Sequence, residues 1–163
     1  MARIDNNAEL TTGPIFRVME VSLAAAALIS VVRSATGIAG WLSARNRASL
    51  SWIPYAYVAE AVALTSLVLL ALLLLQNRRD GPWMSVLWCS VGALTAFMLL
   101  SWWSIGGSFT PAVSCAATAG LVATIRTKTH LVQVIVWSVA GIAGQLLLMV
   151  LVILVFAGSS LKP

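Results

Sequence analysis

Charged residues are scarce in this chain. Of its 163 residues, only 9% are Asp, Glu, Lys or Arg and 60% are hydrophobic, whereas soluble domains carry about 25% charged residues. So few charges cannot give a folded chain a polar surface, and the composition therefore excludes an ordinary soluble domain. It predicts an integral membrane protein whose main solvent is the lipid bilayer.

Residues that carry out catalysis are also few. The chain has one histidine, His130, and two cysteines, Cys89 and Cys115, which form neither a CxxC nor a CxxCH motif. Metal and haem sites need several convergent ligands, and the sequence contains no GxSxG nucleophile turn and no glycine-rich phosphate loop. We therefore expect no metal ion, no cofactor and no enzymatic activity.

Basic residues outnumber acidic ones and give a net charge of +5. They form small clusters between apolar blocks, where basic residues orient membrane proteins and attract anionic lipid headgroups. A nucleic-acid partner would instead favour a basic face on a soluble domain. The expected partners are therefore the lipid bilayer and either another membrane protein or further copies of this chain, with no nucleic acid.

Apolar blocks long enough to cross a membrane recur along the chain. A spanning helix needs about 20 apolar residues, and the blocks predict an all-α fold, a polytopic transmembrane helix bundle, in one domain over residues 15–157. A polar tail is expected over 1–14, ended by the breaker Gly13-Pro14, and another over 158–163. The five predicted spans cover about residues 15–41, 53–75, 83–103, 111–126 and 131–156.

A turn is predicted to separate the third span from the fourth. No charged residue occurs between Gly81 and Ile125, a stretch far longer than one span needs. Glycines within 104–108 accept positive φ, and Thr110 and Pro111 suit the N-cap and first position of the next helix. Because the fourth span is short for a full crossing, the alternative is a four-span chain in which this segment is re-entrant.

The distribution of basic residues predicts the orientation. Cytoplasmic loops of membrane proteins are enriched in Lys and Arg. Five spans place on one side the residues Arg3, Arg17, Arg78, Arg79, Arg126 and Lys128, and on the other side Arg45, Arg47 and Lys162. The N-terminus is therefore predicted to be cytoplasmic and the C-terminus external.

Two charges, Arg33 and Glu60, lie inside apolar segments. Each costs about 2.5–3.5 kcal/mol in the bilayer unless it is compensated. They stand eight residues from Trp41 and Trp52, two expected surface anchors, which places both about 12 Å deep at 1.5 Å per residue. The sequence predicts an ion pair that clasps the first hairpin. Open alternatives are an ion or proton pathway through Glu60 and an Arg33 side chain that extends to the membrane surface.

A second ion pair is predicted at the inner end of the first span. Arg17 and Glu20 are three residues apart, a spacing that brings side chains together on a helix. Arg78 or Arg79 is an alternative partner for Glu20 at the same membrane face.

Small residues predict where helices pack closely. Small side chains let the backbones of transmembrane helices approach each other. Packing within one bundle is the simplest interpretation, and docking to another membrane subunit is the alternative. The predicted packing positions are Gly37, Gly40, Ala116, Gly120, Ala140 and Gly144.

The turn at 104–112, Ser-Ile-Gly-Gly-Ser-Phe-Thr-Pro-Ala, resembles one in many small, largely uncharacterised multi-pass bacterial inner-membrane proteins. In those proteins a SIG-x-F-x-P-A segment joins the last two of four helices, whereas in this chain two residues, Gly107 and Ser108, stand between Gly106 and Phe109. The resemblance covers this turn and the order of the spans around it, and the additional C-terminal span departs from the pattern. It implies a bacterial inner-membrane protein and implies no activity.

Two functions fit these features. The first is a small integral membrane protein without a catalytic site that serves as an accessory subunit of a membrane complex. The second is a small oligomeric transporter or channel that uses the intramembrane residues Glu60 and Arg33.

Overall fold

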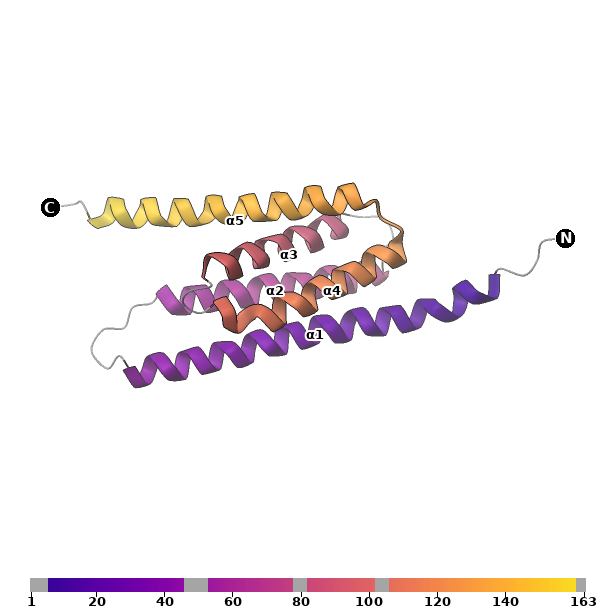
Figure 1. Cartoon of the computed structure of the whole chain (residues 1–163), viewed down its shortest axis with the longest axis horizontal. Helices are drawn as coiled ribbons and strands as arrows, with labels where there is room; N and C mark the ends of the chain where they lie inside the picture. The colour runs from indigo at the N-terminus through magenta and orange to yellow at the C-terminus, as the bar shows by residue number, and fades with distance from the viewer. Residues whose placement is uncertain (1–5, 46–52, 78–81, 102–105, 161–163) are drawn as a thin grey trace.

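A computed structural model describes residues 6–45, 53–77, 82–101 and 106–160. Its helices are α1 (Asn6–Arg45), α2 (Ile53–Asn77), α3 (Trp83–Leu100), the short 3₁₀ helix η1 (Gly106–Phe109), α4 (Thr110–Thr127) and α5 (Leu131–Ser160) (Figure 1). Five of them are long and apolar enough to cross a membrane. The predicted all-α membrane fold with five spans is thus confirmed.

The start of α1 differs from the prediction. The helix begins at Asn6, and Pro14 lies inside it instead of ending a polar tail. The apolar part of the helix nevertheless begins at Pro14 and continues to Ile38. Pro14 therefore marks the boundary between a polar helical extension and the span, and helices of membrane proteins tolerate such a proline when the freed backbone groups find other partners.

The turn before α4 also differs in detail. Gly106 and Gly107 lie in η1, and no described glycine has positive φ. Thr110 is the first residue of α4, where its hydroxyl donates to the Gly107 carbonyl instead of capping the helix. Because η1 adds residues to the apolar segment, the span covers Gly107–Thr127, long enough for a full crossing.

Several predicted positions lie outside the described residues. They are the anchor Trp52, the turn residues Ser104 and Ile105, and the basic residues Arg3, Arg47, Arg78, Arg79 and Lys162.

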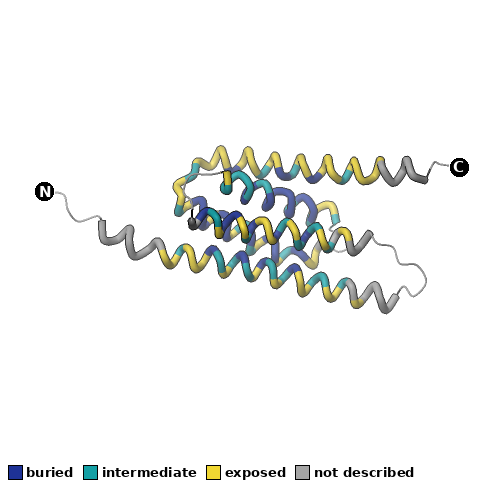
Figure 2. Tube along the Cα trace, turned by 180° about the vertical axis from the view of Figure 1, so that it is seen from behind, coloured by how far each residue is buried: buried dark blue, intermediate teal, exposed yellow. Residues whose placement is uncertain are grey.

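Helices α1 to α4 form a ring, and α5 lies outside it. Within the ring, α1 packs on α2 and α4, and α3 packs on α2 and α4, whereas α5 packs mainly on α3 (Figure 1). Half of the α3 and α4 spans is buried, compared with 22% of the α1 span and 17% of the α5 span. The buried residues accordingly gather in the centre of Figure 2, and most of α5 faces outward.

One end of the ring is closed by a compact apolar cluster. This Phe97–Phe109 cluster consists of Val31, Ala61, Phe97, Phe109 and Ala112, and so joins α1, α2, α3, η1 and α4. The two rings meet edge to face with centroids 5.7 Å apart, a favoured aromatic geometry. Because Val31 and Ala61 share this cluster, the nearby Arg33 and Glu60 lie at about the same level of the bundle.

Candidate functional site

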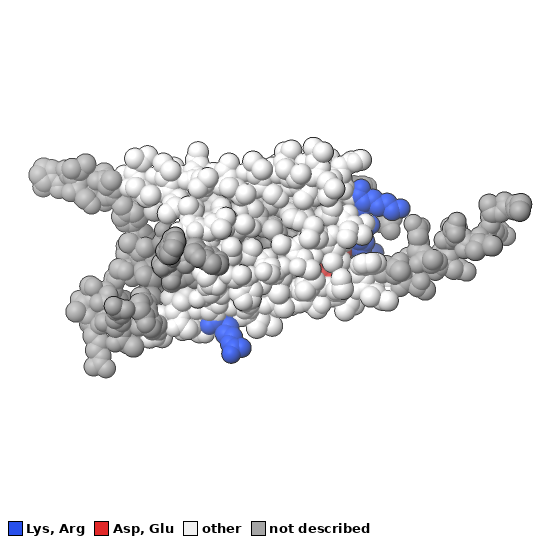
Figure 3. Space-filling view, viewed as in Figure 1, with Lys and Arg blue, Asp and Glu red and all other residues white. Residues whose placement is uncertain are grey.

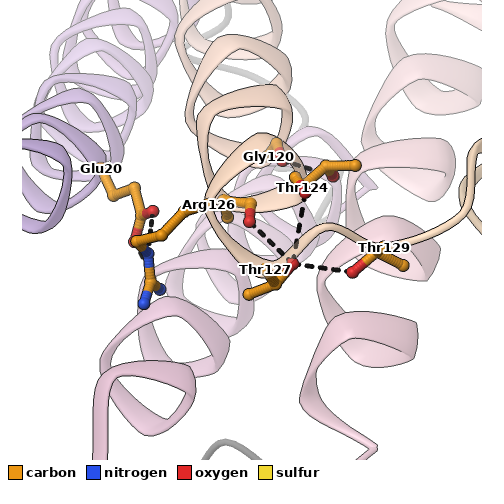
Figure 4. Close-up of polar contacts among 7 residues, drawn as sticks. Glu20, Gly120, Thr124, Arg126, Thr127 and Thr129 are labelled. Carbon is orange, nitrogen blue, oxygen red and sulfur yellow. Dashed lines mark hydrogen bonds and ion pairs between the residues drawn. The ribbon is translucent and has the colours of Figure 1, made fainter. Parts of the chain in front are cut away.

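Glu20 and Arg126 form a bidentate ion pair between α1 and α4. The Glu20 side chain is fully buried, and the Arg126 Nε and Nη2 atoms donate to its two carboxylate oxygens at 2.6 and 3.0 Å (Figure 4). Two parallel charge-assisted bonds hold both side chains in one geometry. An ion pair was expected at Glu20, but this partner is 106 residues away, so local spacing could not indicate it. Arg17 is exposed three residues before Glu20 on α1 and has an interaction partner, so its predicted pairing with Glu20 stays a prediction.

A polar contact fixes α3 against α4. The Trp88 indole nitrogen donates to the Thr124 hydroxyl at 3.0 Å, and that hydroxyl donates to the Gly120 carbonyl at 2.8 Å. A Cβ atom at Gly120 would lie 3.2 Å from the Trp88 ring, so glycine makes room for the indole. Gly120 and its predicted partner Ala116 are both buried, and this small-residue surface faces the interior of the bundle.

Helices α3 and α5 approach each other closely through their backbones. A Cβ atom at Gly92 would overlap the Ser138 carbonyl oxygen, and a Cβ atom at Gly141 would overlap the Cys89 carbonyl oxygen. Each glycine thus lets the backbone of the other helix approach. Backbone contacts of this kind replace the hydrophobic driving force that lipid does not supply.

The other predicted packing positions face outward. Ala140 and Gly144 on α5 are exposed, and a Cβ atom at Gly144 would meet nothing within 4 Å. Gly37 and Gly40 on α1 are likewise exposed with open space above them. Within the bundle, α5 therefore packs through Gly141 and not through Ala140 and Gly144, and the alternative for those two positions, docking to another subunit, stays a prediction.

Glu60 joins α2 to α5. Its Oε1 atom accepts a hydrogen bond of 2.5 Å from the amide of Gln145. Gln145 is 7% exposed and Glu60 is half-buried. The contact ties the outer helix α5 to the ring at a second place, away from its glycine contact with α3.

Arg33 is exposed on α1, and no acidic side chain pairs with it among the described residues. In Figure 3, basic atoms stand out at two places on a largely uncharged face, one over α1 and one beside the turn between α4 and α5. The structure therefore does not bring Arg33 and Glu60 together as the predicted ion pair.

The helical rotation explains this difference. Successive residues on an α-helix are rotated by about 100°. Val31 and Ala61 face the interior of the ring, so Glu60, one residue before Ala61, turns toward α5. Arg33, two residues after Val31, turns to the opposite side of α1. The structure places the two residues at a similar level of the bundle and directs their side chains to different sides.

The turn between α4 and α5 also carries polar groups. Lys128, the residue after α4, has the left-handed conformation with φ of 54°, and the Thr127 and Thr129 hydroxyls lie 2.7 Å apart (Figure 4). His130 is exposed at the start of α5. Lys128 and His130 thus lie at the end of the bundle, where basic side chains can meet lipid headgroups.

Groups with potential for other chemistry are dispersed. Cys89 and Cys115 are free thiols on α3 and α4. The described residues include no group of three or more His, Cys, Asp or Glu side chains that could hold a metal ion.

Sequence reasoning missed Gln145, Gly92 and Gly141. Gln145 carried a usable signal, because it is an amide within an otherwise apolar span, and such groups need a partner in lipid.

The chain matches no family model, no curated protein and no solved structure. The resemblance of the 104–112 turn therefore remains an observation on the sequence.

Proposed function

We propose that this chain is a non-enzymatic integral membrane protein that works as a subunit of a membrane-protein assembly. Its five apolar helices support the membrane location. The resemblance of the 104–112 turn supports the bacterial inner membrane, and the distribution of basic residues supports a cytoplasmic N-terminus.

The observation that carries the proposal is the outward-facing guanidinium of Arg33. It lies within the apolar span Pro14–Ile38 and has no acidic partner among the described residues. A charge at the centre of a spanning helix costs about 2.5–3.5 kcal/mol unless a partner compensates it, and the cost falls toward the end of the span, where Arg33 lies. A carboxylate on a neighbouring membrane helix removes that cost.

The direction of the side chain favours a protein partner over the membrane surface. Arg33 lies closer to Ile38, the C-terminal end of the α1 span, than to its start at Pro14. Cα–Cβ bonds of a helix tilt toward its N-terminus. The Arg33 side chain therefore starts out toward the membrane centre, and extending to the nearer surface means reversing that direction.

The test is the mass of the particle in mild detergent, measured by native mass spectrometry for the wild type and for Arg33→Leu. We expect the wild type to contain more than one chain and Arg33→Leu to release a folded monomer. Ile29→Val is the matched control, because Ile29 is exposed one turn earlier on the same face. A monomeric wild type with the same mass as Arg33→Leu contradicts the proposal.

A second candidate function, a small oligomeric transporter or channel, is favoured by the Glu60–Gln145 contact. Intramembrane carboxylates often line ion or proton pathways. Proton or cation flux in liposomes that Glu60→Gln abolishes supports this function. Equal flux from wild-type, Glu60→Gln and empty liposomes argues against it.

A further inference from the structure

Two oppositely charged residues at one level of the bundle lack a charged partner. Arg33 has no acid beside it among the described residues. Glu60 has a hydrogen bond from a neutral amide, and the described contacts include no cation at its carboxylate. Because the α1–α2 hairpin directs them to different sides, they cannot neutralise each other within one chain.

We propose that the neighbour of this chain in the membrane is a second copy, and that Arg33 of one copy pairs with Glu60 of the next. This inference rests on the proposed function as an assembly subunit, and it names the partner. The Glu60 Oε1 atom accepts from Gln145, and no described hydrogen bond uses Oε2. Oε2 is therefore the oxygen available to the incoming guanidinium.

The common level of the two residues is what this pairing requires. Copies of one chain follow the same charge rule and insert with the same orientation. Only groups at equal depth can then meet between copies. Val31 and Ala61 lie in one cluster, so Arg33 and Glu60 satisfy this condition.

The two residues lie on different surfaces of the bundle. Arg33 is exposed on α1, whereas Glu60 on α2 accepts a hydrogen bond from Gln145 of α5, and α1 and α5 are on opposite sides of the bundle (Figure 1). The contact therefore joins two unlike surfaces. A heterologous contact repeated about an axis along the membrane normal forms a ring when the rotation between copies divides a full turn.

Glycines with open space around them lie near Arg33 on α1 and beside Gln145, the hydrogen-bond partner of Glu60, on α5. Gly37 and Gly40 follow Arg33 on α1, and Gly144 precedes Gln145 on α5. A Cβ atom at any of the three would meet nothing within 4 Å. Small residues at these places let the helices of two copies come close enough for the side chains to pair.

The test is complementation between two variants with different tags, co-expressed and purified in mild detergent. The Arg33→Leu variant retains the Glu60 carboxylate. The Glu60→Gln variant retains Arg33, and its new side-chain amide oxygen can still accept the hydrogen bond from Gln145. The affinity of self-association should fall by about tenfold or more in each variant alone, because the desolvated charge pair between copies has lost one of its two residues. Together they should recover association, and the mixed particle should stop at a dimer because only one intact contact remains.

A wild-type assembly that persists in both single variants, or a mixture that stays monomeric, overturns the pairing. Association that depends on Arg33 but not on Glu60 also overturns the pairing. The proposed subunit function then stands, and Arg33 pairs with a carboxylate on a different membrane helix. A wild type that is monomeric under all conditions overturns both. Ile29→Val on the α1 face is the control that should leave association unchanged.

Discussion

The backbone of Gly141 on α5 lies against the carbonyl oxygen of Cys89 on α3, so close that a methyl group at Gly141 would overlap it. Gly92 on α3 makes the reciprocal contact with Ser138 on α5. Because α5 packs mainly on α3 and most of its surface is exposed, these contacts determine how the last helix is attached to the ring.

Gly141→Ala and Gly92→Ala are therefore expected to force α3 and α5 apart. The added methyl group meets backbone rather than a flexible side chain, and overpacking of this kind typically costs about 1–3 kcal/mol. The measurement is the free energy of unfolding by SDS in mixed micelles. Gly144→Ala is the matched control on α5, because within a single chain its methyl group enters open space. An equal loss in the control would show that intrinsic helix properties, not the contact, set the effect.

Breaking the Glu20–Arg126 ion pair should be more costly. Arg126→Leu leaves the fully buried Glu20 carboxylate without its bidentate partner, and an uncompensated buried charge costs about 3–5 kcal/mol. We expect low accumulation in membranes and a lower thermal midpoint in detergent. The double variant Glu20→Leu with Arg126→Leu should recover part of the loss. If the stability loss of the double variant equals the sum of the losses of the two single variants, the two residues act independently.

The hydroxyl of Thr124 is expected to stabilise the α3–α4 contact. Thr124→Val keeps the side-chain shape but removes the acceptor of the buried Trp88 indole N–H, and an unsatisfied buried donor costs about 1–3 kcal/mol. Thr118→Val is the matched control, since the Thr118 hydroxyl is exposed and bonds only to the Ser114 carbonyl in its own helix. Unfolding by SDS should distinguish the two variants, and equal stability would argue against a role for the indole bond.

The predicted orientation can be measured with single cysteines. In a chain with Cys89→Ala and Cys115→Ala, Asn6→Cys and Ser160→Cys place one thiol at the start of α1 and one at the end of α5. Because five spans put the two ends on opposite sides, a membrane-impermeant maleimide added to intact cells should label position 160 and not position 6. Labelling of position 6 alone would reverse the orientation.

The fold could be predicted because the membrane imposes it. Lipid requires backbone hydrogen bonds to be satisfied within each segment, so long apolar blocks become helices. Predicted starts at 53, 83 and 131 coincide with those of α2, α3 and α5. Pro14 was misjudged because breaker statistics describe soluble helices, whereas here the proline lies at the start of a strongly apolar span.

The candidate site was harder to predict because it depends on rotation about helix axes. Counting residues placed Arg33 and Glu60 at one level, and Val31 and Ala61 do meet there. A step of one residue changes direction by about 100°, and the count does not specify which neighbour each side chain faces. Similarly, Gly141 and Gly144 both suit close packing by composition, and only the position of the Cys89 carbonyl on the facing backbone of α3 selects Gly141.

The bond from Gln145 to Glu60 should contribute to holding α5 on the ring. Gln145→Leu removes the described donor to the half-buried carboxylate, and interhelical hydrogen bonds in membranes contribute about 1 kcal/mol. We expect a loss of that size in SDS unfolding, and partial recovery when Glu60→Leu removes the carboxylate as well. Gln133→Leu is the control, because Gln133 is an exposed amide on the same helix. If both glutamine variants are equally stable, the hydrogen bond contributes no net stability, and α5 is held by its glycine contact with α3.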